Sequence, residues 1–188
     1  MTPLYLIPKL SAIDSEPILK HAKKKYILSE GELSMNRLES KTAVITGGAG
    51  GIGIRVTKLF AEEGANVLIV DVDEKQLQSA CSEIGSNRVT YFVADVTSES
   101  DNQAMIEAAV QRYGGLDCLV ANAGIEGDVT PITEYEEKRF DQVLAVNVKG
   151  PFLGMKAAIP QLEKRGGGSI IITSSIAGLQ GAPMFSAY

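Results

Sequence analysis

Apolar stretches of strand length alternate with helical patterns along most of this chain, from Lys41 onward. The apolar stretches predict β-strands at residues 42–46, 66–70, 88–94, 116–121 and 169–173. Between the first four of them, apolar residues recur at helical spacing, beginning with Ile52, Val56 and Leu59. Because strands joined by helical crossovers pair in parallel, we expect one sheet with helices on both faces. The pattern therefore predicts an α/β domain with a doubly wound parallel sheet of five strands.

Several residues mark where the predicted helices begin and end. Glycines follow the first three helices, at positions where a left-handed residue commonly ends a helix: Gly64, Gly85 and Gly114. Ser100 and Gln103 have the spacing of a capping box and predict the start of the third helix.

A longer helical pattern fills residues 134–165 and contains two prolines. Gly150-Pro151 is expected to break or kink this helix, because proline has no N–H to donate. Asn147 is therefore expected to lie beside a helix irregularity.

Residues 1–35 show neither a strand pattern nor a glycine loop, and they contain a run of lysines around His21. We interpret them as an N-terminal extension that is largely disordered. A basic amphipathic helix that includes Ile18 and Tyr26 is the alternative. The patterned domain then covers residues 36–188.

A glycine-rich loop joins the first strand to the first helix. Residues 46–53 read Thr-Gly-Gly-Ala-Gly-Gly-Ile-Gly. A helix that starts from such a loop presents unpaired backbone N–H groups and the positive end of its dipole, so it binds phosphate. The glycines fit two registers, Gly48-x-Gly50-x-x-Gly53 and Gly47-x-x-x-Gly51-x-Gly53, and the sequence leaves both open. The loop predicts a nucleotide-binding domain.

Asp71 ends the second predicted strand, close to the offset of about 20 residues at which a carboxylate binds the adenosine ribose. A carboxylate at this place would repel a 2′-phosphate, and no Arg or Lys follows it before Lys75. The sequence therefore favours NAD over NADP. An acid after a strand can instead cap the next helix, and Asp73 is also placed to do so.

The composition excludes several function classes. With 18 basic and 23 acidic residues the net charge is −5, so no basic field favours a nucleic-acid partner. No apolar stretch has the length of a membrane span. Cys81 and Cys118 are the only cysteines and do not form a C-x-x-C pair, which favours a reducing, cytoplasmic setting. His21 is the only histidine, which argues against a metal site and against a serine hydrolase built on Ser174 or Ser175.

Further motifs follow the glycine loop in order along the chain. They are Asp95-Val96, Asn122-Ala123-Gly124, Asn147-Val148-Lys149-Gly150, and Ser174-Ser175 followed by Tyr188. Together with Thr46 to Gly53 they make residues 36–188 resemble the short-chain dehydrogenase/reductase family, classical type, truncated at the C-terminus. The resemblance implies a Rossmann-like NAD-binding domain without the last strands of the family fold.

The resemblance assigns a role to each matching position. Tyr188 would exchange a proton with the substrate oxygen, Ser175 would hydrogen-bond that oxygen, and Asn147 would support a water-linked proton relay. The residues expected to bind the cofactor are Thr46, Gly47, Gly51, Ile52, Gly53, Asp71, Asp95, Val96, Asn122, Ala123 and Gly124. The implied reaction is hydride transfer between NAD and a small secondary alcohol or ketone.

One residue of the family pattern has no counterpart in the sequence. A free tyrosine, with a pKa of about 10, is a poor base unless a cation stabilises its phenolate. In the family that cation is the lysine of a Tyr-x-x-x-Lys pattern, whereas this sequence ends at Tyr188. The alternative function is therefore a dinucleotide-binding fragment without turnover. Taken singly, Tyr188, Ser175 and Asn147 also fit a terminal aromatic, a turn residue and a helix-break residue.

The resemblance also implies that a full-length form is a homo-oligomer. In this chain, strand 169–173 is expected at a sheet edge with Ile170, Ile171 and Ile172 exposed, which predicts poor solubility or abnormal association. Residues 125–131 and 179–185 are expected to line part of the substrate pocket.

Overall fold

The structure is a computed structural model that describes residues 36–188, so the predicted extension at residues 1–35 lies outside the described part. Within residues 36–188, five strands form one parallel sheet in the order β3-β2-β1-β4-β5. These strands are β1 (Thr42–Thr46), β2 (Asn66–Asp71), β3 (Val89–Val93), β4 (Cys118–Ala121) and β5 (Ser169–Ile172). The prediction of a doubly wound parallel sheet is confirmed.

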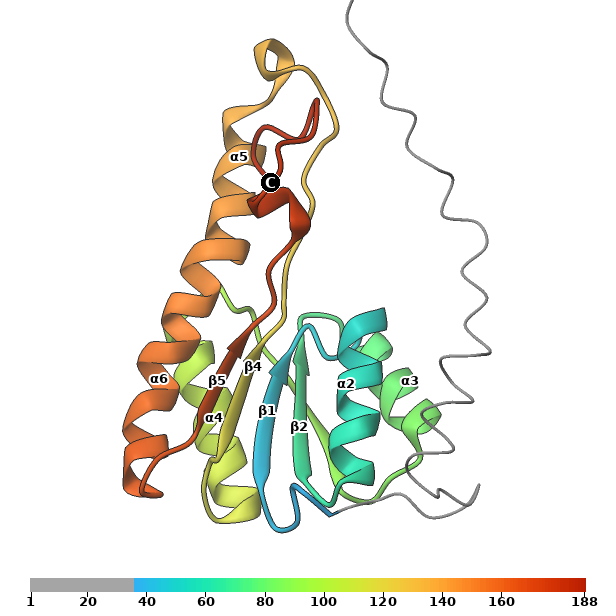
Figure 1. Cartoon of the computed structure of the whole chain (residues 1–188), viewed down its shortest axis with the longest axis vertical. Coiled ribbons are helices and arrows are strands. Elements are labelled where there is room, and N and C mark those ends of the chain that lie inside the picture. The colour runs from blue at the N-terminus through green and yellow to red at the C-terminus, as the bar shows by residue number, and fades with distance from the viewer. Residues whose placement is uncertain (1–35) are drawn as a thin grey trace, which may run out of the picture. The chain divides into compact units, whose positions relative to one another are not determined.

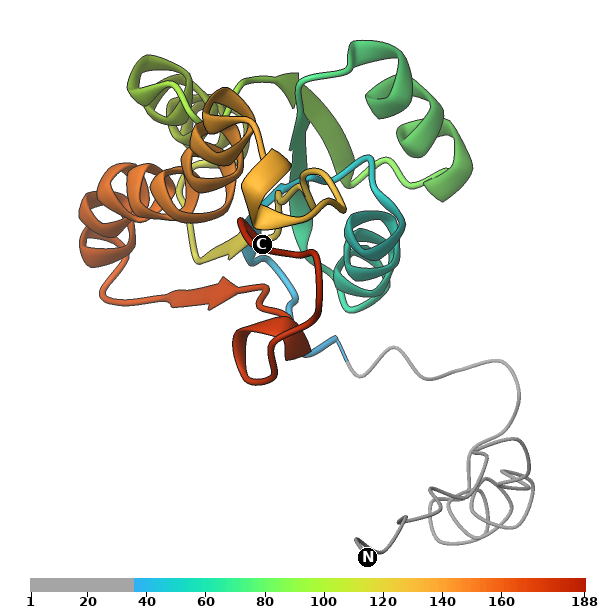
Figure 2. The ribbon, with the colours of Figure 1, turned by 90° about the horizontal axis from the view of Figure 1, so that it is seen from above.

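Helices cover both faces of this sheet (Figures 1 and 2). One face carries α2 (Gly51–Glu62) and α3 (Glu74–Ile84), and the other carries α4 (Glu99–Tyr113) and α6 (Gly150–Lys164). The helix α5 (Glu137–Leu144) continues into α6 through a π-helical turn, η2 (Ala145–Lys149). Two 3₁₀ turns, η1 (Ile132–Glu134) and η3 (Ile176–Gly178), lie in the loops that follow β4 and β5.

Alternation of side chains along β1 produces the two helical layers. Val44 packs in the buried cluster that contains Met105 of α4 and Leu162 of α6. Its neighbour Ile45 points to the opposite face and packs in the cluster that contains Leu77 of α3. Each such side chain contributes about 1.5–3 kcal/mol by leaving water. Since all five residues of β1 are buried, the glycine loop begins at the end of a fully covered strand.

The helix ends agree with the sequence in most respects. The three predicted glycines all have positive φ: Gly64 at 94°, Gly85 at 65° and Gly114 at 82°. The predicted capping box of Ser100 and Gln103 is wrong, because α4 begins two residues earlier. Its N-cap is Ser98, whose hydroxyl accepts the N–H of Asp101 at 3.3 Å.

The long helix differs from the prediction at one point. No break occurs at Gly150-Pro151, since α6 begins directly at Gly150 and continues through Pro160 to Lys164. The irregularity is the preceding turn η2, which has Asn147 at its centre, so the expected place of this residue is confirmed. The wider π turn gives the ring of Pro151 room against the preceding backbone, where a regular turn would clash.

The strand β5 lies at one edge of the sheet, as predicted. Ile171 and Ile172 are 46% and 50% exposed, whereas Ile170 is half-buried because it packs against the cluster under α6. The expectation of full exposure is thus wrong for Ile170 alone. Among the helices of residues 36–188, none has both the length and the apolar character needed to cross a membrane.

Asp117 ties three elements together at the end of the sheet opposite the glycine loop. Its carboxylate accepts the N–H of Thr42 at 2.9 Å and lies 3.3 Å from both Lys41 Nζ and Arg165 Nη2. Burial by itself raises the pKa of this carboxyl, but the Thr42 N–H and the two cations outweigh it and hold the pKa of Asp117 below its ordinary value. The start of β1, the start of β4 and the end of α6 are fixed to one charged group.

Candidate functional site

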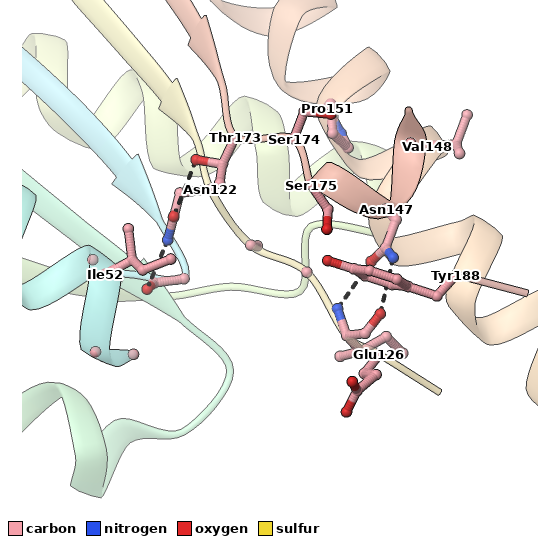
Figure 3. Close-up of a pocket in the computed structure, with 18 of the residues that line it drawn as sticks. Ile52, Asn122, Glu126, Asn147, Val148, Pro151, Thr173, Ser174, Ser175 and Tyr188 are labelled. Atoms are coloured by element: carbon pink, nitrogen blue, oxygen red, sulfur yellow. Dashed lines mark hydrogen bonds between the residues drawn. The ribbon is translucent and has the colours of Figure 1, made fainter. Parts of the chain in front are cut away.

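A pocket of about 780 Å³ opens at the carboxyl ends of the strands, where ligands bind in open α/β sheets (Figure 3). Its walls come from the glycine loop, the end of β2, the loop after β4, the turn η2 and the segment after β5. The lining residues are Gly47, Gly50, Gly51, Ile52, Gly53, Asp71, Asn122, Ala123, Gly124, Ile125, Glu126, Asn147, Val148, Pro151, Thr173, Ser174, Ser175, Gly178 and Tyr188. Most of the predicted site residues therefore share one cavity.

The structure separates the two glycine registers. Gly47, Gly51 and Gly53 all line the pocket, whereas Gly48 faces Ile69 of β2, which a Cβ would approach to 2.6 Å. Gly47 has a φ of 62°, and a Cβ on it would lie 2.8 Å from Ala123 Cα. A Cβ on Gly53 would collide with the carbonyl oxygen of Gly47. All three glycines of the wider register line the cavity; in the other register Gly50 and Gly53 line it, whereas Gly48 packs against the sheet.

The start of α2 suits a phosphate. Gly50 is the N-cap of this helix and makes no side-chain cap, and the first turn of α2 contains no acidic residue. The N–H groups of that turn therefore keep their hydrogen-bonding capacity for an anion, at the positive end of the helix dipole. The glycines allow such a group to approach the backbone closely. On these grounds the loop fits the phosphates of a nucleotide.

Of the two acids after β2, Asp73 is the one that caps the next helix. The carboxylate of Asp73 accepts the N–H groups of Lys75 and Gln76 and caps α3. Asp71 lines the pocket instead, and its carboxylate accepts the N–H of Val72 at 2.8 Å and that of Ala49 at 3.4 Å. The acid at the end of β2 thus faces the cavity that begins at the glycine loop.

Thr46 and Asn122 connect the loops at the centre of the site. The buried Thr46 hydroxyl accepts the N–H groups of Asn122 and Ala123, each at 3.1 Å. The Asn122 amide donates to the carbonyls of Thr46 and Gly47, and its oxygen accepts the hydroxyl of Thr173. Asn122 lines the pocket, but Thr46 does not, so Thr46 acts by holding its neighbours in place.

The three residues predicted to be catalytic lie at the other end of the pocket (Figure 3). Asn147 in η2 is hydrogen-bonded to the backbone of Ile125. Ser175 follows β5, and its hydroxyl accepts the N–H of Ala177 at 3.2 Å as the cap of η3. The phenol of Tyr188 points to the side of the pocket where Ser175 and Asn147 lie. The fold brings together hydroxyl and amide groups from three separate segments.

Asp95 and Val96, like Thr46, are predicted cofactor residues that stay outside the pocket lining. The Asp95 carboxylate accepts the N–H and the hydroxyl of Thr97, both at 2.8 Å, in a local turn. Val96 is buried and packs toward Gly150 at the start of α6. Their loop starts next to Asp71, because the N–H of Ala94 donates to the Asp71 carbonyl at 3.0 Å.

Some lining residues were not predicted. Of the loops expected to line the pocket, only Ile125 and Glu126 do so, whereas residues 179–185 do not. Val148, Pro151, Thr173 and Gly178 were missed. Val148 belongs to the Asn147 to Gly150 motif and Pro151 follows it, while Thr173 precedes Ser174. Their nearness to a motif is the sequence signal that could have identified them as lining residues.

The charges that line the pocket are all negative. Asp71 and Glu126 carry them, and no Lys, Arg or His of the described part belongs to the lining. Within residues 36–188, no three His, Cys, Asp or Glu side chains lie together in a way that could hold a metal ion.

The sequence matches known proteins over this same region. A family model described as short chain dehydrogenase matches residues 41–188. Short chain aldehyde dehydrogenase 1 of Euphorbia lathyris is 46% identical over 141 residues, which make up 74% of this chain and 49% of the relative. Dehydrogenase/reductase SDR family member 4 of Homo sapiens is 35% identical over 162 residues, or 85% of this chain and 58% of the relative. The chain thus spans only about half the length of these relatives.

Solved structures agree with the sequence match. NAD⁺-bound xylitol dehydrogenase superposes with a TM-score of 0.77 at 33% identity, covering 81% of this chain and 59% of that one. Levodione reductase superposes with a TM-score of 0.78 at 31% identity, covering 81% of this chain and 60% of that one. Since the family model matches nearly all of the described residues, this chain belongs to the short chain dehydrogenase family.

Proposed function

We propose that this protein is an NAD-dependent oxidoreductase that transfers a hydride between the nicotinamide and a secondary alcohol or ketone. One observation carries the proposal: the glycine loop with Asp71 and the group of Asn147, Ser175 and Tyr188 line two ends of one pocket (Figure 3). The relatives named above are dehydrogenases and a reductase, and one of them is NAD⁺-bound.

The residues at the first end fit a dinucleotide. The free N–H groups at the start of α2 would hold the phosphates, and the Asp71 carboxylate would accept hydrogen bonds from the adenosine ribose. Because the carboxylate is negative, a 2′-phosphate would be repelled. Ile52, Ala123 and Gly124 would contact the dinucleotide between its two ends.

At the second end, the chain's own groups would handle the substrate oxygen. When bound, the cofactor supplies or accepts the hydride. The Tyr188 hydroxyl would give a proton to the substrate oxygen in reduction and accept it in oxidation, while the Ser175 hydroxyl donates a hydrogen bond to the same oxygen. For that bond the Ser175 hydroxyl has its proton available, because in η3 it acts as an acceptor. Asn147 would hold the loop beside them through Ile125.

A second candidate is a dinucleotide-binding protein without turnover. The observation in its favour is the absence of a cationic side chain among the described residues that line the pocket, because a phenol needs such a neighbour to act as a base at neutral pH. Both candidates predict nucleotide binding, and only the first predicts substrate oxidation.

Calorimetric titration of the purified chain with NAD⁺ and with NADP⁺ tests the binding. We expect tighter binding of NAD⁺, and we expect Asp71→Asn to reduce the ratio of the two affinities by about tenfold. Asp141→Asn, an exposed acid of α5 outside the pocket, is the matched control and should leave the ratio unchanged. A chain that prefers NADP⁺, or binds neither nucleotide, would contradict the proposal.

Turnover separates the two candidates. The chain is incubated with NAD⁺ and a panel of secondary alcohols, and the formation of NADH is followed by absorbance. Formation that is lost in Tyr188→Phe supports the oxidoreductase, whereas nucleotide binding without any NADH favours the second candidate. Homo-oligomerisation and a cytoplasmic location remain predictions, the latter consistent with free Cys81 and Cys118.

A further inference from the structure

The first turn of α4 holds the loop after β3 through two neighbouring side chains. The amide of Asn102 donates to the carbonyl of Val96 at 2.8 Å and to that of Ser98 at 2.7 Å. The carboxylate of Asp101 accepts the N–H of Asp95 at 3.0 Å. Asp101 therefore holds the Asp95 N–H, and Asn102 holds the Val96 carbonyl.

Asn102 is an unfavourable residue for core packing alone. It is 1% exposed, and its Oδ1 has no hydrogen-bond partner within the described residues. It also lines a cavity of about 10 Å³, so it does not fill the space between α4 and α6 completely. An apolar side chain of similar size would avoid an unpaired buried acceptor. What only the amide supplies is the pair of N–H donors to the carbonyls of Val96 and Ser98.

The loop that Asn102 holds contacts the end of β2 and the start of α6. At its start, the Ala94 N–H donates to the carbonyl of Asp71, whose side chain lines the main pocket. Further on, the Val96 side chain packs toward Gly150, where a Cβ would lie only 3.0 Å from Val96 Cγ2. The small cavity beside Asn102 shares Ala123 and Pro151 with the main pocket. Because of the hydrogen bond between Ala94 and Asp71, a shift of this loop would displace the Asp71 end of the pocket.

We propose that Asn102 is a positioning residue for the adenosine half of the dinucleotide. The inference rests on the proposed function, in which Asp71 receives the adenosine ribose, and on the family resemblance, which implies a cofactor contact for Asp95 and Val96. Asn102 touches no ligand in this arrangement. It acts by fixing the Val96 carbonyl, and with it the direction in which the loop leaves β3.

The test compares the two halves of the cofactor as separate probes, AMP and nicotinamide mononucleotide, each titrated against the whole chain. Asn102→Leu keeps the branching of the side chain at Cγ and its number of heavy atoms but removes both donors, so we expect AMP to bind about five- to tenfold more weakly. Nicotinamide mononucleotide should bind as before. Gln103→Leu, at the exposed next position, is the matched control and should change neither affinity.

A purely structural role would weaken both probes together or neither. Equal weakening of AMP and nicotinamide mononucleotide in folded Asn102→Leu would overturn the inference, as would unchanged AMP binding. If Asn102→Leu does not fold, Asn102→Ser takes its place, because it keeps one donor and is smaller; a weakening of AMP binding alone is again expected. Failure of the unsubstituted chain to bind AMP and NAD⁺ would overturn the proposed function itself.

Discussion

The side chain of Asn147 pairs with the backbone of Ile125 in both directions. Its Oδ1 accepts the Ile125 N–H at 2.9 Å, and its Nδ2 donates to the Ile125 carbonyl at 2.9 Å. Two hydrogen bonds between one amide side chain and one residue's backbone imitate the pairing of two strands. Since both residues line the pocket, the turn η2 determines where this wall of the pocket stands.

Replacement of Asn147 should therefore destabilise the domain. Asn147→Ala loses both hydrogen bonds, and we expect the free energy of unfolding to fall by about 1–3 kcal/mol in urea titrations. Asn147→Asp keeps the acceptor but places a carboxylate against the Ile125 carbonyl, so it should not restore stability. Asp141→Ala, exposed on α5, serves as the control. Wild-type stability of Asn147→Ala would show that the pairing contributes nothing.

Two glycines of the loop should respond in opposite ways to the same substitution. Gly53→Ala places a Cβ against the Gly47 carbonyl and 2.8 Å from Gly48 Cα, so we expect a loss of about 1–3 kcal/mol and of nucleotide binding. Gly51→Ala meets nothing within 4 Å at the start of α2 and should be neutral or stabilising by up to about 1 kcal/mol. Thermal unfolding of both variants checks this. Equal effects of the two substitutions would refute the assignment of contacts.

Low pH should reduce the free energy of unfolding, because the hydrogen bond and ion pairs of Asp117 are lost when its carboxylate is protonated. The pKa of Asp117 is lower in the folded chain than the unfolded value of about 3.9, so its contribution is complete above that value and is lost as the pH falls through the folded pKa. We expect Asp117→Asn to be less stable by about 1–3 kcal/mol at pH 7 and to show a shallower loss of stability in acid.

The measurement for Asp117 is urea unfolding between neutral and strongly acidic pH. Asp128→Asn provides the control, because Asp128 forms an ion pair with Arg139 in which the Asp128 side chain is 51% exposed. It should change stability little at any pH. Parallel pH profiles for Asp117→Asn and the unsubstituted chain would contradict the prediction.

The exposed edge of the sheet should promote self-association. Ile171→Lys and Ile172→Lys put a charge on β5, which discourages pairing with a second strand. We expect both variants to shift sedimentation profiles toward smaller species. Leu179→Lys is a control outside the strand, at a side chain that is 88% exposed. A chain that is monomeric without substitution would disprove the prediction.

Periodicity and glycines were enough to predict the sheet and the place of the pocket. The strand at residues 42–46 and the left-handed glycines depend on local preferences, which a sequence displays directly. The choice between the two glycine registers required the structure, because Gly48 is kept out of the pocket by its contact with Ile69, a residue on another strand. Such a contact follows from the packing of the loop and has no sequence pattern.

Two local predictions failed because neighbouring residues could serve the same purpose. Ser98 and Ser100 can both start a helix, and Ser98 does so because Asp101 is placed to donate its N–H and accept the Ser98 hydroxyl. At Pro151 the chain widens the turn before the proline instead of ending the helix. The role of Thr46 was also beyond the sequence, since its partners Asn122 and Ala123 belong to a different loop.

The central position of β1 bears on how the site responds to a ligand. Strands at the edges of a sheet open more readily than those in the middle, and hydrogen exchange should be slowest in β1, between β2 and β4. The glycine loop emerges from this central strand, so we expect its N–H groups to be arranged before any ligand arrives. Little conformational entropy remains to be lost there on binding. Binding of a ligand to the loop should therefore slow amide hydrogen exchange mainly in the peripheral loops, whose conformational freedom is greater in the unbound protein.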